Sequence, residues 1–224
     1  MLKKKYGKGL IVIAICVSAM AVIRISAEPI LEGVSFSSAL YDKDGKLMRL
    51  TLAGGEVYRL YVPIENISDK FKETTLIYED KWFYFHFGVN PVSLIRAAVF
   101  FISGGNKPSG ASTVTMQTAR MIYDINSKSV SGKLKQIFAA IWLEIKYSKK
   151  DILEAYFNLA PYGHNIEGAE AAALIYFNVQ AKDLTLFESF ALAVIPQNPN
   201  GRVLTSAKGR EKSLESRKRI FPLW

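Results

Sequence analysis

The sequence predicts a mainly α-helical domain, with a small β-hairpin segment leading into it and an N-terminal transmembrane anchor. Three features carry this prediction. From residue 90 onward, apolar residues recur at helical spacing and are accompanied by capping signals. Residues 36–64 read as strands and turns, and a lysine-rich start precedes an apolar run. With 224 residues, half of them hydrophobic, the chain is long enough to bury one core.

Residues 1–27 are interpreted as a cytoplasmic basic segment followed by a membrane anchor or signal. Four lysines precede an apolar run of 14 residues, Leu10 to Ile23, and Arg24 follows it. A full span needs about 20 residues. A cleaved signal peptide and an uncleaved anchor that extends to Ala27 therefore both stay open. By the positive-inside rule, either of them exports the rest of the chain.

The charge distribution argues against a nucleic-acid partner. Residues 25–200 hold 17 Lys/Arg against 18 Asp/Glu, a net charge of −1, so the overall +9 arises at the two ends. No basic groove across the body is indicated, and basic ends suit an anionic membrane surface. The single cysteine, Cys16, excludes an internal disulfide. The two histidines lack the spacing of a zinc site, so no metal site made by the protein alone is predicted.

The segment 28–67 is expected to be a β-rich linker. In "ALYDKDGKLMRL" a turn signal at Asp44-Gly45 lies between alternating residues, which predicts a hairpin, and "EVYRLYVPI" is a further strand candidate. Ser68 is placed to cap a helix that runs through Tyr78. The domain proper is expected to span residues 68–200, and 201–224 to form a basic tail.

The remaining helices are predicted from their caps. Asn90-Pro91 begins a segment, "VSLIRAAVFFI", that is apolar nearly all round and is therefore buried or in contact with lipid. A second helix begins at Ser112 or Thr113 and ends near Ile122. The others are a long amphipathic helix over Lys133–Tyr147, one that follows the capping box "SKKD", a small-residue helix in "GAEAAALIYF", and one that follows "TLFE" and ends at Pro196.

The stretch "IYEDKWFYFHFG" contains the first candidate for chemistry, Glu79. Six aromatic residues surround the Glu79-Asp80 pair. A carboxylate among aromatic side chains is desolvated, which raises its pKa and suits a general acid or base that works near neutral pH. On this stretch alone, a solvated acid at a helix end is the alternative for Glu79. A hydrogen-bonded structural histidine is the alternative for His86.

The second candidate is "GASTVTMQTAR". Ser112 and Thr113 lie at a predicted helix N-terminus, where exposed N–H groups and hydroxyls favour an anion. Gln117 and Arg120 lie further along that helix, and Arg120 could grip a phosphate oxygen. The alternative is an ordinary Ser/Thr cap with a solvated arginine.

Together, and in this order, these segments resemble the first two signatures of the peptidoglycan glycosyltransferases, family 51, found in class A penicillin-binding proteins. The later stretches "LEIKYSKKDILEAYFNLAPYGHNIEGAEAAALIYF" and "LTLFESFALAVIPQNP" resemble the later signatures. The resemblance covers residues 36–200, and "STVTMQ", "NLAPYG" and "LAVIPQ" look most like the 1C-type branch. The transpeptidase domain of class A proteins is absent from this sequence, so a monofunctional protein and a truncated bifunctional one both stay open.

The resemblance implies a lysozyme-like fold that polymerises lipid II into β-1,4 glycan strands and releases undecaprenyl diphosphate. It implies that Glu79 is the general base and that motif-two residues hold the donor diphosphate, with a divalent cation, Mg or Mn, bound together with that diphosphate. The implied substrate-binding residues are Asp80, Phe83, His86, Ser112, Thr113, Gln117, Arg120, Lys133 and Gln136.

The resemblance also implies a location and partners for the protein. It would be a single-pass protein of the bacterial cytoplasmic membrane, with its catalytic domain on the periplasmic side. Its partners would be lipid II, the growing glycan strand, the membrane and other cell-wall synthesis proteins. "AAVFFI" would be the surface that contacts lipid.

Motif three departs from the family pattern, in which an arginine and a glutamate stand where this chain has Gly132 and Gln136, while Lys133 is kept. Glutamine cannot act as a base, although it can still form hydrogen bonds. One alternative that follows is a catalytically weak or inactive scaffold of the cell-wall machinery. A second alternative, suggested by a lone glutamate in an apolar wall, is a glycan-cleaving enzyme on the same fold.

Overall fold

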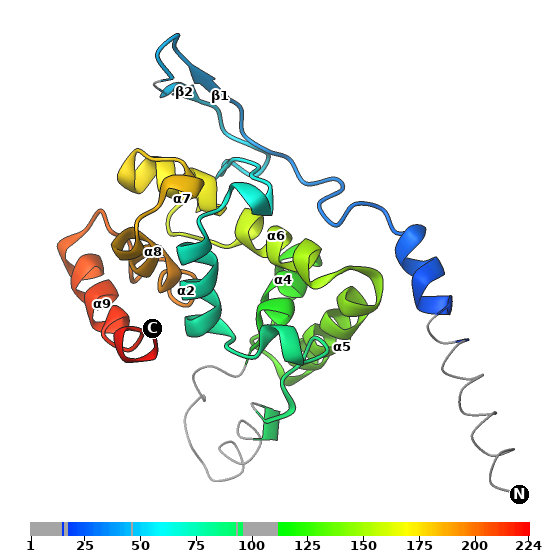
Figure 1. The fold of residues 1–224 in the computed structure, drawn as a ribbon. Coiled ribbons are helices and arrows are strands. Elements are labelled where there is room, and N and C mark those ends of the chain that lie inside the picture. The colour runs from blue at the N-terminus through cyan, green and yellow to red at the C-terminus, as the bar shows by residue number, and fades with distance from the viewer. Residues whose placement is uncertain (1–14, 16–17, 46, 93, 96–111) are drawn as a thin grey trace, which may run out of the picture.

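The computed structural model describes residues 15, 18–45, 47–92, 94–95 and 112–224 (Figure 1). Most of these residues are helical, so the mainly α prediction is confirmed. The helices are α2 (Asp69–Glu79), α4 (Val114–Ile122), α5 (Val130–Lys146), α6 (Lys149–Leu159), α7 (Ala169–Phe177), α8 (Leu186–Ala193) and α9 (Ala207–Arg217). The strands are β1 (Ala39–Tyr41), β2 (Leu47–Leu50), β3 (Tyr58–Arg59) and β4 (Ile166–Glu167), and the 3-10 turns include η2 (Phe83–Phe85) and η4 (Phe221–Leu223).

Local capping places several helix starts where the sequence predicts them. The Thr113 hydroxyl accepts a hydrogen bond from the backbone N–H of Met116 and so begins α4. Both predicted capping boxes are present, at Ser148–Asp151 for α6 and at Thr185–Glu188 for α8. These signals depend on residues within one turn of each other, which is why the sequence alone reveals them.

The start of one helix and the cap of another differ from prediction. The helix α5 begins at Val130 rather than Lys133, because the Ser129 side chain caps it from within a stretch expected to be a loop. Ser68 stands at the N-terminus of α2, but its hydroxyl does not cap that helix. It donates instead to the carbonyl of Leu184 at 3.1 Å, which ties α2 to a segment far along the chain.

The β structure consists of two small pairs of strands. The strands β1 and β2 form the predicted antiparallel hairpin, which projects from the helical body (Figure 1). The strand β3 pairs in parallel with β4. It is shorter than the predicted strand because the backbone groups of Val62, further along the same segment, form hydrogen bonds with the Asn158 side chain instead of with a strand. That side chain donates to the Val62 carbonyl at 2.8 Å and accepts from the Val62 N–H at 2.9 Å.

The core brings together the helices that carry the candidate site residues. The helix α4 packs against both α5 and α6, and α2 packs against α8 (Figure 1). Burying one large apolar side chain stabilises a fold by about 1.5–3 kcal/mol. The largest fully buried side chains of the main core include Phe71, Phe83, Met116, Leu143, Tyr156 and Phe157.

The chain after residue 200 forms α9 and η4, which lie against α8. The Phe190 ring lies 4.9 Å from the Phe221 ring and 5.7 Å from the Trp224 ring, measured between centroids. Ile220 is fully buried beside them. The segment expected to be a basic tail is therefore helical and packed. The predicted division of the chain into segments stays a prediction.

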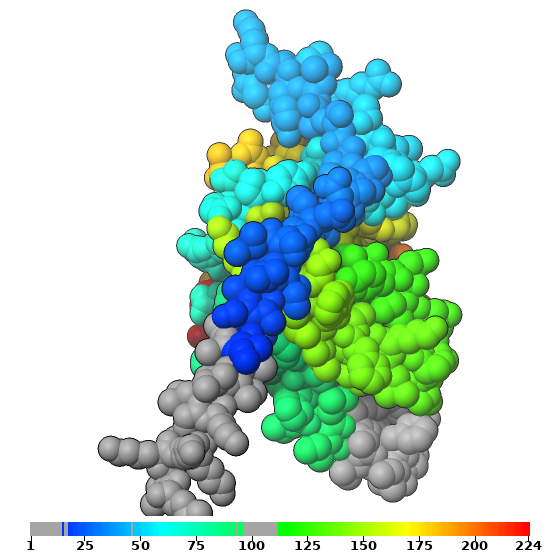
Figure 2. Space-filling view, turned by 90° about the vertical axis from the view of Figure 1, so that its right-hand side faces the viewer, coloured from blue at the N-terminus to red at the C-terminus, as the bar shows by residue number. Residues whose placement is uncertain are grey.

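At the N-terminal end, residues 18–25 are helical and run alongside the body near α5 (Figure 2). Arg24 donates hydrogen bonds to the carbonyls of Glu144 and Ile145, at 2.9 and 3.1 Å. Within the described part of the chain, no helix has the length and apolar character needed to cross a membrane. The first part of the predicted anchor, and the predicted lipid-contacting segment 97–102, lie outside the described residues.

Candidate active site

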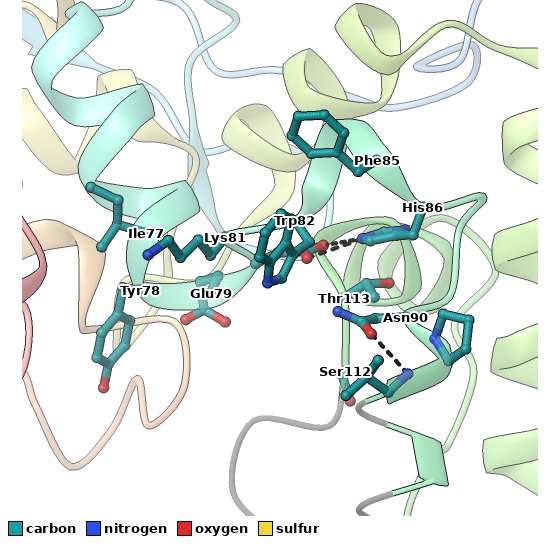
Figure 3. A pocket seen from close by; sticks show the side chains of 13 residues that line it. Ile77, Tyr78, Glu79, Lys81, Trp82, Phe85, His86, Asn90, Ser112 and Thr113 are labelled. Carbon is teal, nitrogen blue, oxygen red and sulfur yellow. Dashed lines mark hydrogen bonds and ion pairs between the residues drawn. The ribbon is translucent and has the colours of Figure 1, made fainter.

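A cavity of about 580 Å³ opens at the C-terminal end of α2 (Figure 3). Its walls come from the end of α2, from the aromatic segment that follows, from Asn90–Val92 and from Ser112–Thr113. The first two candidate motifs therefore meet at one cavity, although about 30 residues separate them in the sequence.

Glu79 is the last residue of α2 and lines this cavity. Its Oε2 accepts a hydrogen bond from the Gln117 side chain of α4 at 2.7 Å. Its Oε1 is buried and has no hydrogen-bond partner among the described residues. Burial raises the pKa of Glu79 from 4.5 to about 7, and Gln117, Gln197 and Arg202 only partly offset that rise. The predicted direction of this pKa shift is confirmed.

The aromatic wall predicted around Glu79 is wrong in part. Trp82 and Phe85 line the cavity but are 57% and 81% exposed, because the turn η2 carries them to the surface. Two fully buried tyrosines, Tyr156 of α6 and Tyr162, lie close enough for their hydroxyls to interact electrostatically with the Glu79 carboxylate. Burial, and after it the charge on Glu79, raises the pKa of both hydroxyls. The buried aromatic side chains that interact with Glu79 therefore come from α6 and the loop after it.

Asp80 and Thr113 connect the first motif to the N-terminus of α4. Asp80 Oδ2 accepts from the Val114 N–H at 3.0 Å, and both Asp80 oxygens contact His86 Nε2, at 3.0 and 2.9 Å. A carboxylate at a helix N-terminus is stabilised by the helix dipole. The Thr113 hydroxyl donates to the Gly88 carbonyl at 2.6 Å. Both side chains thus tie the first motif to the N-terminus of α4 and to each other's segment.

The glycine at the end of the aromatic segment is required by its surroundings. Gly88 has a φ of +78°, and a Cβ there would lie 2.8 Å from the carbonyl oxygen of Ala140. The aromatic segment can therefore pass this close to α5 only with glycine at this position.

The cationic side of the site is formed by α4 and α5. Lys133 Nζ donates to Ser112 Oγ at 2.6 Å and to Gln136 Oε1 at 2.9 Å. Ser112 lines the cavity, so the ammonium group lies just behind the wall. Burial, and after it the charge of Arg120, lowers the pKa of Lys133. Two cations held this close to each other favour an anionic ligand.

Gln136 is fully integrated into this side of the site. Its amide NH₂ donates to the Met116 carbonyl at 2.7 Å while its oxygen accepts from Lys133, so the two ends of the amide have different partners. At Gly132 the arginine of the family pattern has no room, since even a Cβ would lie 1.9 Å from the Asn126 carbonyl oxygen. Both departures in motif three are therefore matched by the surrounding structure.

The chemistry of these side chains does not fit a divalent cation held by the protein. Such cations prefer carboxylate and carbonyl oxygens, whereas the side of the site near Ser112 presents Lys133 and Arg120. The oxygens of Asp80 are already bound to His86 and to the Val114 N–H. Among the residues that the structure describes, no cluster of three or more His, Cys, Asp or Glu side chains could hold a metal ion.

The side chains around Glu79 differ from those predicted from the sequence. Phe83, a predicted substrate-binding residue, is buried in the core beneath Lys149, whose Nζ lies 4.4 Å from the ring centroid. Tyr78, Gln197 and Arg202 approach Glu79 instead. Gln197 stands within "LAVIPQNP", a stretch that the family resemblance includes, but nothing in the sequence pairs it with α2.

The domain is mainly helical and has a carboxylate of raised pKa at a cavity, with Lys133 behind another part of the wall and Arg120 acting electrostatically on Lys133. This arrangement is of the kind that suits acid–base chemistry on an anionic substrate. The Transglycosylase family model matches residues 44–221. The chain therefore belongs to the transglycosylase family, glycosyltransferase family 51, which confirms the family predicted from the motifs.

Similar proteins are longer than this chain. Penicillin-binding protein 1C of Escherichia coli (strain K12) is 39% identical over 76% of this chain and 22% of its own length. Penicillin-binding protein 2D of Bacillus subtilis is 35% identical over 90% of this chain and 29% of its own length. The crystal structure of penicillin-binding protein 1A from Haemophilus influenzae matches with a TM-score of 0.42 and 18% identity, over 84% of this chain and 18% of that one. That structural likeness is too weak to support an argument.

Proposed function

We propose that this chain is a peptidoglycan glycosyltransferase that polymerises lipid II into β-1,4 glycan strands and releases undecaprenyl diphosphate, with Glu79 as the general base. The observation that carries the proposal is the environment of Glu79. Its carboxylate has a pKa of about 7, lines a cavity, and is hydrogen-bonded to the helix whose other residues reach the cationic side. A base with a pKa near the working pH is the most effective one.

The proposed step is a direct displacement. The 4-hydroxyl of the acceptor sugar loses its proton to the Glu79 carboxylate as its oxygen bonds to C1 of the donor sugar. The bond between C1 and the phosphate oxygen breaks, and the diphosphate leaves with the electron pair, so the configuration at C1 inverts. Lys133 and Arg120 would neutralise the charge that develops on the leaving group, which is commonly among the largest contributions to catalysis.

The divalent cation expected from the family stays a proposal. Because the protein side chains suit an anion better than a metal ion, we propose that Mg or Mn would be bound mainly by the substrate diphosphate. The location at the bacterial cytoplasmic membrane, the single-pass anchor, and the partners in cell-wall synthesis also remain proposals. They are supported by the names of the relatives and by the apolar N-terminal run.

A polymerisation assay with labelled lipid II tests the proposed function. The purified protein in detergent should form glycan polymer, and Glu79→Gln should lower the rate by roughly 10²–10⁴-fold because it removes the base. Glu73→Gln is the matched control, since Glu73 is an exposed residue of the same helix. Its rate should equal that of the wild type. Full polymerisation by Glu79→Gln would exclude Glu79 as the base.

A catalytically inactive scaffold is the second candidate, and the departures at Gly132 and Gln136 are what favour it. It predicts that cells carrying Glu79→Gln grow and keep their shape as cells carrying the wild type do. A defect in cells with Glu79→Gln, at equal protein level and with Glu73→Gln normal, would rule against the scaffold.

A further inference from the structure

A chain of hydrogen bonds leads from Arg202 to the cavity through residues to which no role has been assigned. Arg202 Nη1 donates to the Tyr78 hydroxyl at 3.0 Å and to the Val194 carbonyl at 2.6 Å. The Tyr78 hydroxyl donates to Gln197 Oε1 at 3.0 Å. Tyr78 directly precedes Glu79, and both side chains extend to the same side of α2 in Figure 3.

The direction of this chain is fixed by its donors. A guanidinium group can only donate, so the Tyr78 hydroxyl must accept from Arg202 and direct its own proton to Gln197. The Gln197 oxygen is then occupied, and its NH₂ group is the end left to face a carboxylate. In agreement, the Gln197 side chain lowers the pKa of Glu79, while Glu79 Oε1 itself has no hydrogen-bond partner among the described residues. Bonds aligned in one direction also polarise and strengthen one another.

We propose that Arg202, Tyr78 and Gln197 form a positioning relay that keeps the Glu79 carboxylate oriented and ionised for proton abstraction, an inference that rests on the proposed function. Gln117 holds Oε2 from the α4 side. The relay would supply the second hydrogen bond, which Oε1 lacks in the absence of substrate. Gln197 is exposed, in the turn that follows α8. A small movement of its amide as substrate enters would therefore complete this contact.

The other charged or titratable groups around Glu79 act differently from the relay. On its own helix end, Asp80 raises the pKa of Glu79, and Lys81 lines the cavity. From α6 and the loop after it, Tyr156 and Tyr162 face the carboxylate with buried hydroxyls. The positively charged group that lowers the pKa of Glu79 is the guanidinium of Arg202. The guanidinium at the far end of the relay therefore favours the ionised carboxylate both directly and through Tyr78 and Gln197.

Tyr78→Phe tests the relay because it removes one hydroxyl and leaves the ring. Without the relay the carboxylate is less stabilised, so the acidic limb of the pH–rate profile for lipid II polymerisation should move up by roughly half a pH unit or more. The rate on the alkaline plateau should fall as well, because the carboxylate is then oriented from the α4 side alone. Tyr84→Phe is the matched control, because Tyr84 is an exposed tyrosine in η2 outside the relay, and its profile should not move.

A second measurement separates the relay from the proposed function. In protein labelled with ¹³C at glutamate carboxyls, the Glu79 signal is assigned by its loss in Glu79→Gln, and its titration midpoint is followed in each variant. Tyr78→Phe and Gln197→Ala should both raise the midpoint, and Tyr84→Phe should not. Unchanged midpoints in both relay variants would overturn the relay. If the midpoints rise but the wild type makes no polymer at any pH, the relay stands and the proposed function fails.

Discussion

The two sides of the site are buried alike but are assembled differently. Glu79 is held by Gln117 of α4, and it interacts electrostatically with residues from other distant parts of the chain, Arg202 after α8 and Tyr156 on α6. On the cationic side, Lys133 and Arg120 lie on the consecutive helices α5 and α4, which pack together. Burial raises the pKa of Glu79 and lowers the pKa of Lys133.

This difference shows how one site can hold two groups of opposite charge, each made less stable in its charged form by burial. At both sides, burial makes the charged form more costly, so each side gains when substrate arrives with the complementary group. In the proposed reaction, a diphosphate would restore favourable interactions to Lys133, and an acceptor hydroxyl would offer a proton to Glu79. The two sides should therefore fail in different ways when each is altered separately.

Among changes that leave Glu79 in place, the largest effect is expected on the cationic side. Lys133→Met keeps the side-chain length but removes the charge, so kcat/KM for lipid II should fall by roughly 10²–10³-fold. The acidic limb of the pH–rate profile, which Glu79 controls, should stay in place. Lys135→Met is the control, since Lys135 is an exposed residue of the same helix, and it should leave the rate unchanged. A shifted acidic limb in Lys133→Met would show that the two sides are not independent.

The next effect is a gain in stability at the base side. The pKa of Glu79 rises from 4.5 to about 7 on folding, so the folded state binds the proton more tightly than the unfolded state does. The free energy of unfolding should therefore fall as the pH rises from about 4.5 through about 7, by up to about 3 kcal/mol. Glu79→Gln removes this titration. It should be more stable than the wild type at pH 8 and similar to it at pH 4.

Urea unfolding at these two pH values measures this gain. Glu73→Gln on the same helix serves again as control, and its stability relative to the wild type should be nearly the same at both pH values. A Glu79→Gln gain of equal size at pH 4 and pH 8 would contradict the raised pKa. The variant would then lose activity without gaining the stability that removal of a buried, ionisable side chain is expected to give.

What the sequence could predict depended on distance along the chain. The caps at Thr113, Ser148 and Thr185 each involve residues within one turn, so the sequence alone predicted them. The site residues in the two main motifs were predicted from their residue types, and the structure brings Glu79 and Gln117 into contact.

The parts that could not be predicted depend on tertiary packing. Gln197 reaches the Tyr78 hydroxyl only because α8 packs against α2, and no local pattern encodes that pairing. The aromatic segment was expected to bury Glu79, but a 3-10 turn carries Trp82 and Phe85 to the surface. The conformation of that turn follows from the bonds of Asp80 to α4, which the sequence does not reveal.

The smallest expected effect tests whether Gln136 is a defect or a fitted part of the cationic side. Gln136→Glu restores the residue of the family pattern. A carboxylate cannot donate to the Met116 carbonyl, so the hydrogen bond from α5 to α4 would be lost. The carboxylate would also pair with Lys133 and compete with the diphosphate for that charge. We therefore expect KM for lipid II to rise about tenfold, which corresponds to about 1.4 kcal/mol, with the acidic limb unmoved. Gln180→Glu, the same change at an exposed position, is the control. A variant faster than the wild type would show that the glutamine limits catalysis, and it would strengthen the scaffold alternative for the natural chain.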